Sequence, residues 1–158
     1  AEVTVAFERG VPVGLDGRTL ELAALIRELD ALGGRYGYGR VDMIENRRVG
    51  IKSRELYEVP AALALITAHR ALEDLTLERE LAHHKAHLEQ IWADCVYDGT
   101  WFGPLRAAID AFVEATQEPV TGEVRLRFEP GTCTSMANGD RSIATACARE
   151  PGFVPPPA

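Results

Sequence analysis

The sequence predicts an α+β domain with an antiparallel or mixed sheet, a run of amphipathic helices and an irregular carboxy-terminal tail. Two observations carry this prediction: alternating apolar residues lie near both ends of residues 1–130, and apolar residues at helical spacing lie between them. A chain of 158 residues, of which 46% are hydrophobic and 26% charged, is long enough for one sizeable core. We therefore expect one domain over residues 1–130, followed by a divergent and poorly ordered tail over residues 131–158.

A β-hairpin is expected at the start of the chain. Apolar residues alternate with polar ones from Val3 to Phe7, Arg9-Gly10 interrupts the pattern, and a short second strand follows over Val11–Val13. Asp16-Gly17 then supplies a second turn. These features predict two paired strands and a further turn before the first helix.

The first helix is expected to begin at Thr19, whose hydroxyl can cap it, and to end at Gly33-Gly34. The glycine-rich segment from Gly33 to Gly39 follows a helix rather than a strand and fits neither phosphate-binding fingerprint, so we interpret it as a connection between helix and strand. The apolar positions of the helix are Leu22, Leu25, Ile26, Leu29 and Leu32.

Two extended segments, three helices and a final strand follow. Pro60 suits the first turn of a helix, because its missing N–H has no partner there in any case. Pro130-Gly131 ends the last strand. The expected segments are strands over 41–49 and 51–59, helices over 61–72, 76–97 and 104–116, and a strand over 120–128.

Composition excludes several classes of protein. The formal net charge of −7 argues against a nucleic-acid partner, which would require a basic face. No apolar stretch approaches the roughly 20 residues of a membrane span, and the amino terminus has no signal pattern. Cys95, Cys133 and Cys147 show no CxxC spacing, so we expect neither a disulfide framework nor a zinc site, and a reducing cytoplasm as the location.

Several chemically active residue types are given ordinary interpretations. His83, His84 and His87 lie on one expected helix without an HExxH motif, so we expect surface histidines and no metal site. Cys95 has no neighbouring base and is expected to be a buried, unreactive thiol. The aromatic residues Trp92, Trp101 and Phe102 are expected to pack in a core or a subunit interface.

The densest polar segment covers residues 42–58, where four acidic and four basic side chains interleave on the two expected strands. The simplest interpretation is a solvated, ion-paired face of a sheet, in which each exposed pair contributes about 0–1 kcal/mol. The same segment carries a second signal in its order of residues, GRVDMIENR over 39–47 and GIKSRELYE over 50–58.

These two segments closely resemble argininosuccinate synthases, and so do ALEDLTLERE over 71–80, VYDGTWFGP over 96–104 and VTGEVRL over 120–126. The resemblance covers most of residues 1–128, whereas residues 132–158 resemble nothing in the family. A truncation, a shifted reading frame or a divergent paralogue would each explain that difference.

The resemblance implies an ATP-dependent ligase that joins citrulline to aspartate through a citrullyl-adenylate, in arginine biosynthesis and the urea cycle. It also implies a cytoplasmic homotetramer, and it implies that Glu45 and Tyr57 contact citrulline. A carboxylate suits the ammonium of this substrate, and a phenol adds a neutral hydrogen bond that fixes its orientation. We expect the two side chains to share a cleft, because a bend near Val49-Gly50 would pair their strands.

The family's other half, which binds ATP with magnesium and most of the substrates, has a serine- and glycine-rich pyrophosphate loop that this sequence does not contain. We therefore assign no catalytic residue and no cofactor site, and we expect the chain alone to be inactive and to self-associate or be marginally stable. Three hypotheses remain open: a part of the ligase, a non-catalytic assembly module and a stand-alone citrulline-binding domain.

Overall fold

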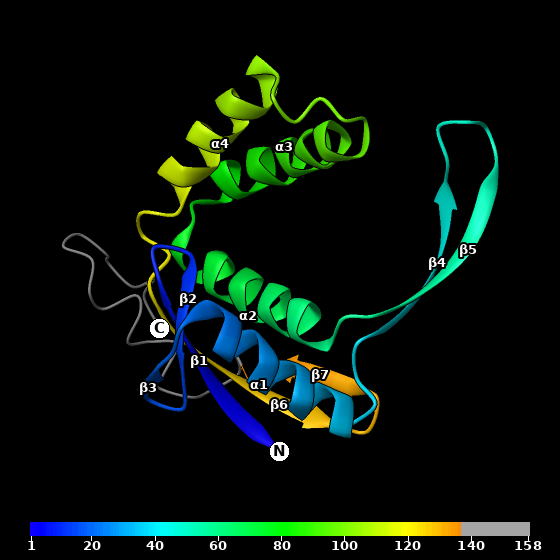
Figure 1. Ribbon diagram of the computed structural model, residues 1–158. Helices are drawn as coiled ribbons and strands as arrows, with labels where there is room; N and C mark the ends of the chain where they lie inside the picture. The colour runs from blue at the N-terminus through cyan, green and yellow to red at the C-terminus, as the bar shows by residue number, and fades with distance from the viewer. Residues whose placement is uncertain (137–158) are drawn as a thin grey trace.

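The computed structural model describes residues 1–136 and confirms the α+β prediction, with four helices and seven strands in two antiparallel sheets in that range. The larger sheet has the strand order β3-β2-β1-β6-β7, so that β1 lies beside a strand from the far end of the described chain (Figure 1). Its strands are β1 (Glu2–Glu8), β2 (Val11–Leu15), β3 (Arg18–Thr19), β6 (Gly122–Glu129) and β7 (Thr132–Ser135).

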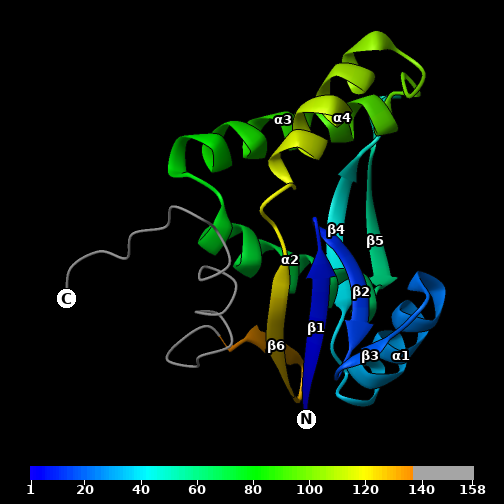
Figure 2. The same ribbon diagram turned by 90° about the vertical axis from the view of Figure 1, so that its left-hand side faces the viewer.

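The main core lies between this sheet and the helices α1 (Leu22–Arg35) and α2 (Pro60–Thr76), which cover one face of it (Figure 2). The register pairs Val3 with Leu126 and Val5 with Val124, so the apolar residues of the two central strands gather on that face. The buried core residues are Val3, Val5, Phe7, Leu15, Leu25, Leu29, Ala61, Ala64, Ala68, Leu72, Val120, Val124, Leu126 and Phe128.

The helices α3 (Arg79–Tyr97) and α4 (Pro104–Thr116) pack against each other as a hairpin and stand beyond the end of α2 (Figure 1). The side chain of Glu78 caps α3 by accepting a hydrogen bond from the Leu81 N–H, and Pro104 occupies the first turn of α4. Cys95 and Ile109 are buried, but neither belongs to the main core. Among the described residues, no helix is both long and apolar enough to cross a membrane.

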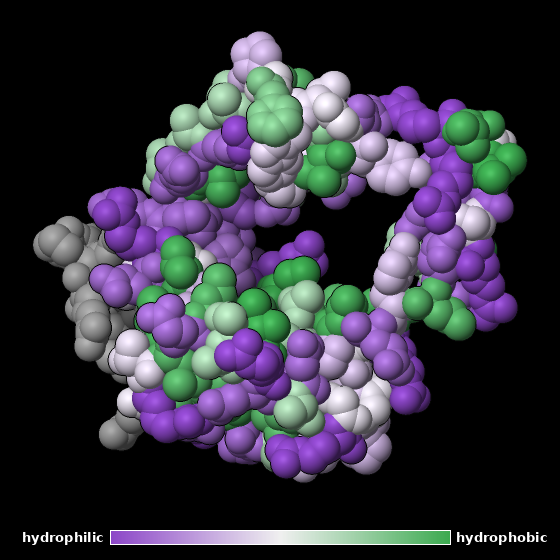
Figure 3. Space-filling model, in the orientation of Figure 1, coloured by the Kyte–Doolittle hydropathy of each residue, from purple (hydrophilic) through white to green (hydrophobic). Residues whose placement is uncertain are grey.

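The strands β4 (Arg40–Asn46) and β5 (Lys52–Glu58) form a separate two-stranded sheet, which we call the ribbon. Seven residue pairs hold it together, from Arg40 opposite Glu58 to Asn46 opposite Lys52. Figure 3 shows the ribbon standing apart from the sheet-and-helix layer, with an opening between that layer, the ribbon and the α3–α4 hairpin.

Two predictions about the first helix were wrong. Thr19 belongs to β3, and α1 begins at Leu22 after Glu21, which makes no side-chain capping bond. The helix also continues through Gly33-Gly34 to Arg35. Gly33 is needed there for packing, because a Cβ at this position would lie 2.7 Å from Cβ of Pro60. Gly37 and Gly39 lie in the connection between α1 and β4, as expected.

Further boundaries differ from the prediction, among them the end of the strand expected over 41–49, which lies at Asn46. Thr76 ends α2 instead of starting the next helix, because the chain leaves the helical region at Leu77 before α3 begins. The first residues of the expected tail form β7, in which Cys133 pairs with Phe128 and Ser135 with Leu126. This pairing gives the backbone of residues 132–135 hydrogen-bond partners that composition could not reveal. The rest of the expected tail, from residue 137 onward, lies outside the described residues.

Candidate functional site

The candidate site lies on one face of the ribbon. Side chains on directly opposite residues share a face, and the register pairs Glu45 with Ser53, Met43 with Glu55 and Val41 with Tyr57. Glu45 and Tyr57 therefore lie on the same face, as expected from a bend between their strands. In that bend the Arg47 N–H donates to the Ile51 carbonyl, and the Gly50 N–H donates to the Arg47 carbonyl. Gly50 has a φ of +83°, a conformation that favours glycine.

A direct hydrogen bond joins the two predicted residues, from the Tyr57 hydroxyl to Oε1 of Glu45. The second carboxylate oxygen, Oε2, lies 3.4 Å from Nη2 of Arg47. The hydrogen bond to Glu45 raises the pKa of Tyr57, because loss of the phenol proton would place two negative charges side by side. The side chain of Glu45 is 15% exposed, so its carboxylate is partly shielded from water.

Arg47 is the centre of a larger polar cluster on this face. Its Nη2 lies 2.7 Å from Oε1 of Glu55, and its Nε donates to Oγ of Ser53 at 3.0 Å. The contact with Glu55 raises the pKa of Arg47, and hydrogen bonds from Ser53 and Arg47 lower the pKa of Glu55. With two carboxylates and one guanidinium, the cluster of Glu45, Arg47, Ser53, Glu55 and Tyr57 carries one net negative charge.

The sequence assigned no role to Arg47, Ser53 and Glu55. The available signal was the alternation of positions 45 and 47 on the expected strand 41–49, and of positions 53, 55 and 57 on the next expected strand. It became informative only with the register, because a shift by one residue would have moved these side chains to the other face.

The opposite face of the ribbon matches the simpler interpretation of this segment as an ion-paired surface. Arg54 Nε donates to Oδ1 of Asp42 at 2.8 Å, and Arg40 Nε to Oε1 of Glu58 at 3.1 Å. The contact with Arg54 lowers the pKa of Asp42. Leu56, 74% exposed, lies on this face as an apolar side chain left in water.

The other residues considered in the sequence mostly have structural roles. Trp92 contacts Trp101 edge to face at 5.4 Å and donates from Nε1 to Oδ1 of Asp110, but Trp101 is 39% exposed and neither residue belongs to the main core. Phe102 is 96% exposed and is not part of the core either. Cys95 is buried as expected.

The expected surface histidines and the remaining cysteines add no further candidate. His83, His84 and His87 are all exposed, as predicted. Burial raises the pKa of Cys133 to about 11, and Cys147 lies outside the described residues. Within residues 1–136, no group of three His, Cys, Asp or Glu residues could hold a metal ion.

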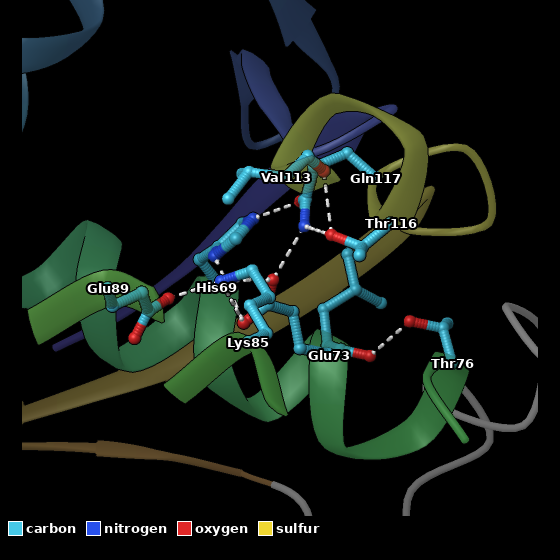
Figure 4. A network of polar contacts seen from close by, with 9 residues as sticks. His69, Glu73, Thr76, Lys85, Glu89, Val113, Thr116 and Gln117 are labelled. Atoms are coloured by element: carbon cyan, nitrogen blue, oxygen red, sulfur yellow. Dashed lines mark hydrogen bonds and ion pairs between the residues drawn. The ribbon is translucent and has the colours of Figure 1, made fainter. Parts of the chain in front are cut away.

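A second polar cluster, which the sequence did not reveal, joins α2, α3 and the end of α4 (Figure 4). Lys85 is 5% exposed and lies 3.1 Å from Oε1 of Glu73, with Glu89 as a second partner. Gln117 donates to Oε1 of Glu73 at 2.7 Å and contacts His69 Nε2 at 2.8 Å. These side chains bond to one another, so the cluster is a structural junction between the helices.

A family model described as arginosuccinate synthase C-terminal domain matches residues 1–144. The match includes every described element and both Glu45 and Tyr57. It also extends past β7, which corrects the expectation that the resemblance ends before residue 132. The chain therefore belongs to the argininosuccinate synthase C-terminal domain family, a family of ligases.

Proposed function

We propose that this chain supplies one wall of the citrulline site of an ATP-dependent ligase that joins citrulline to aspartate. The observation that carries the proposal is the hydrogen bond between Tyr57 and Glu45, on a ribbon face with one net negative charge. Because citrulline carries an ammonium group, a carboxylate that is held in place is a suitable partner for it.

The distances around Arg47 favour Glu45 over Glu55 as the partner of the ammonium. Arg47 lies 2.7 Å from Glu55 and 3.4 Å from Glu45, so its charge mainly compensates Glu55. The Glu45 carboxylate is left with the neutral Tyr57 hydroxyl as its closest donor. Tyr57 can in turn accept a hydrogen bond from the same ammonium, which would fix the orientation of the substrate.

In this proposal the chain positions citrulline and does not carry out the chemistry. ATP with magnesium, and aspartate, would bind to a nucleotide-binding part whose phosphate loop is not found in this sequence. The ureido oxygen of citrulline would then attack the α-phosphate and release pyrophosphate, and the aspartate amine would displace AMP. Both steps depend on alignment of the reacting atoms, to which a fixed ammonium contributes.

We also infer that the chain contributes subunit contacts in a cytoplasmic homo-oligomer. Exposed apolar side chains support this proposal on the ribbon, at Ile44 and Leu56, and in the α3–α4 hairpin, at Phe102 and Leu105. The same observation supports the second candidate function, a non-catalytic assembly module. The two functions differ in whether Glu45 and Tyr57 are required for ligand binding.

Calorimetric titration of citrulline into the chain, alone and with the nucleotide-binding part added, tests the proposal. Glu45→Gln keeps the shape and removes the charge, so we expect a loss of about 1.5–3 kcal/mol, a tenfold or greater rise in the citrulline Kd. Tyr57→Phe should cost about 1 kcal/mol. The control for Glu45→Gln is Glu58→Gln, which removes a carboxylate from the same ribbon, but from strand β5 and the opposite face.

The proposal fails if Glu58→Gln and Glu45→Gln weaken citrulline binding equally. Equal losses of ATP and citrulline affinity in Glu45→Gln would show that Glu45 supports the fold instead of the substrate. In a separate activity assay with citrulline, aspartate and ATP, the chain alone should form no argininosuccinate.

A further inference from the structure

The carboxy-terminal end of α3 touches the ribbon at two points next to Glu45. The Tyr97 hydroxyl donates to the backbone carbonyl of Asn46 at 3.1 Å. The adjacent residue, Asp98, forms an ion pair with Arg48. Tyr97, the last residue of α3, and Asp98, its carboxy-terminal cap, therefore hold the two residues that flank Arg47 at the tip of the ribbon. Figure 1 shows this tip beside the end of α3.

The ribbon has little other support among the described residues. Within residues 1–136, β4 and β5 pack extensively only against each other. Val49 at its tip is 79% exposed. Because an isolated two-stranded ribbon is at best marginally stable in water, even the small free energy of an exposed contact can decide how well its far end is held.

The α3 end is itself well anchored, so it can act as a fixed point. The backbone N–H groups of Asp98 and Thr100 donate to the carbonyls of Asp94 and Cys95, at 2.8 and 3.0 Å. Cys95 is buried, and Trp92 one turn earlier bonds to Asp110 of α4. The ribbon is thus attached at its far end to the end of α3, which is packed against α4.

Asp98 is in an unfavourable place for the helix alone. It is the carboxy-terminal cap of α3, where the helix dipole disfavours a negative charge. The Asp98 side chain therefore does not stabilise α3 through the helix dipole. Its ion pair with Arg48 is a contact outside the helix that can offset this cost.

We propose that Tyr97 and Asp98 are positioning residues that latch the ribbon to α3 and thereby hold Glu45 and Tyr57 in place for the substrate. The latch affects the order of the ribbon whether or not a ligand binds there. Its effect on citrulline binding rests on the proposed function.

Amide hydrogen exchange of the chain, combined with citrulline titration, tests the latch. Tyr97→Phe and Asp98→Asn should each speed exchange of the β4–β5 amides about two- to fivefold, with β1 and β6 unchanged. Citrulline Kd should rise by a similar factor. Asp98→Asn should slow exchange in the last turn of α3, because it removes the charge that the dipole disfavours.

Matched controls remove the same chemical groups elsewhere. Tyr36→Phe removes a tyrosine hydroxyl that accepts from the amino terminus, and Glu118→Gln breaks an exposed ion pair with Arg9. Neither should alter ribbon exchange. The charge swap Arg48→Asp with Asp98→Arg should restore ribbon protection and citrulline affinity that Asp98→Arg alone loses.

Unchanged ribbon exchange in both Tyr97→Phe and Asp98→Asn overturns the latch. Faster exchange with unaltered citrulline affinity overturns the positioning role. If the unaltered chain, alone or with the nucleotide-binding part, binds no citrulline, the proposed function fails, and the exchange data still decide on the latch.

Discussion

At the scale of single residues, the site is defined by how Glu45 shares its two carboxylate oxygens. One accepts a hydrogen bond from Tyr57, and the other lies 3.4 Å from an arginine that is closer to Glu55. A carboxylate paired with a neutral donor keeps most of its charge available for a cationic ligand, whereas a short ion pair would neutralise it.

The pKa of Tyr57 provides a test of this arrangement. The hydrogen bond to Glu45 raises this pKa above its ordinary value, so Glu45→Gln should lower it. The measurement is a titration of the tyrosine ring carbons by NMR, with Tyr97 as the internal comparison. Because the folded-state pKa is the higher one, the bond's contribution to stability is present below the ordinary tyrosine pKa and is lost as the pH rises through the folded value. If the pKa of Tyr57 is the same in Glu45→Gln, the hydrogen bond between Tyr57 and Glu45 is contradicted.

At the scale of elements, the base of the ribbon is set by a close backbone approach at Gly39. This residue has a φ of +94°, and its carbonyl accepts from the Val59 N–H at 2.8 Å. A Cβ at this position would lie 2.3 Å from Cα of Pro60, an atom of the backbone that cannot move aside cheaply. The glycine therefore allows β4 to leave α1 directly beside the start of α2.

The strain of the positive φ alone should cost Gly39→Ala about 1–3 kcal/mol of the free energy of unfolding. The backbone clash with Pro60 should add to this loss. Gly37→Ala is the matched control, since Gly37 also has a positive φ, of +65°, but its Cβ would meet nothing within 4 Å. Urea unfolding of the two variants measures the difference. Equal losses would mean that the contact with Pro60 relaxes without cost.

At the scale of the whole molecule, polar contacts join the α3–α4 hairpin to the rest. The main core contains residues of β1, β2, α1, α2, β6 and the segment just before β6, while Lys85, Glu73 and Gln117 connect α3 and the end of α4 to α2. Burial alone would lower the pKa of Lys85, but hydrogen bonds to Glu89 and Glu73 outweigh it and raise the pKa. Lys85 is therefore charged at neutral pH, and its removal would leave Glu73 buried without its cation.

Lys85→Met should destabilise the fold by about 3–5 kcal/mol, and Lys85→Met with Glu73→Leu should recover much of this loss, because no unpaired charge stays buried. Thermal or urea unfolding checks both, with Lys52→Met at the exposed end of β5 as a control that should change stability by less than about 0.5 kcal/mol. A double variant as unstable as the single one would show that the ion pair itself, and not the avoidance of an unpaired charge, stabilises the junction.

The sequence by itself determined the class of fold and most of the elements. Alternation identified the central strands, helical spacing and Pro104 predicted α4 with its observed bounds, and a contiguous motif gave Glu45 and Tyr57 as candidate site residues. These features depend on neighbouring residues, so a local pattern is enough to reveal them.

Only the tertiary structure decided which side chains meet. The register of β4 and β5 placed Ser53 and Glu55 on the face of Glu45, and the bend after β4 brought Arg47 to them. The end of α3 reached Asn46 and Arg48 from about 50 positions away along the chain. The same holds for the strand β7 and for the burial of Lys85. A contact between distant segments depends on how the whole chain packs, and no periodicity in one segment encodes the position of another.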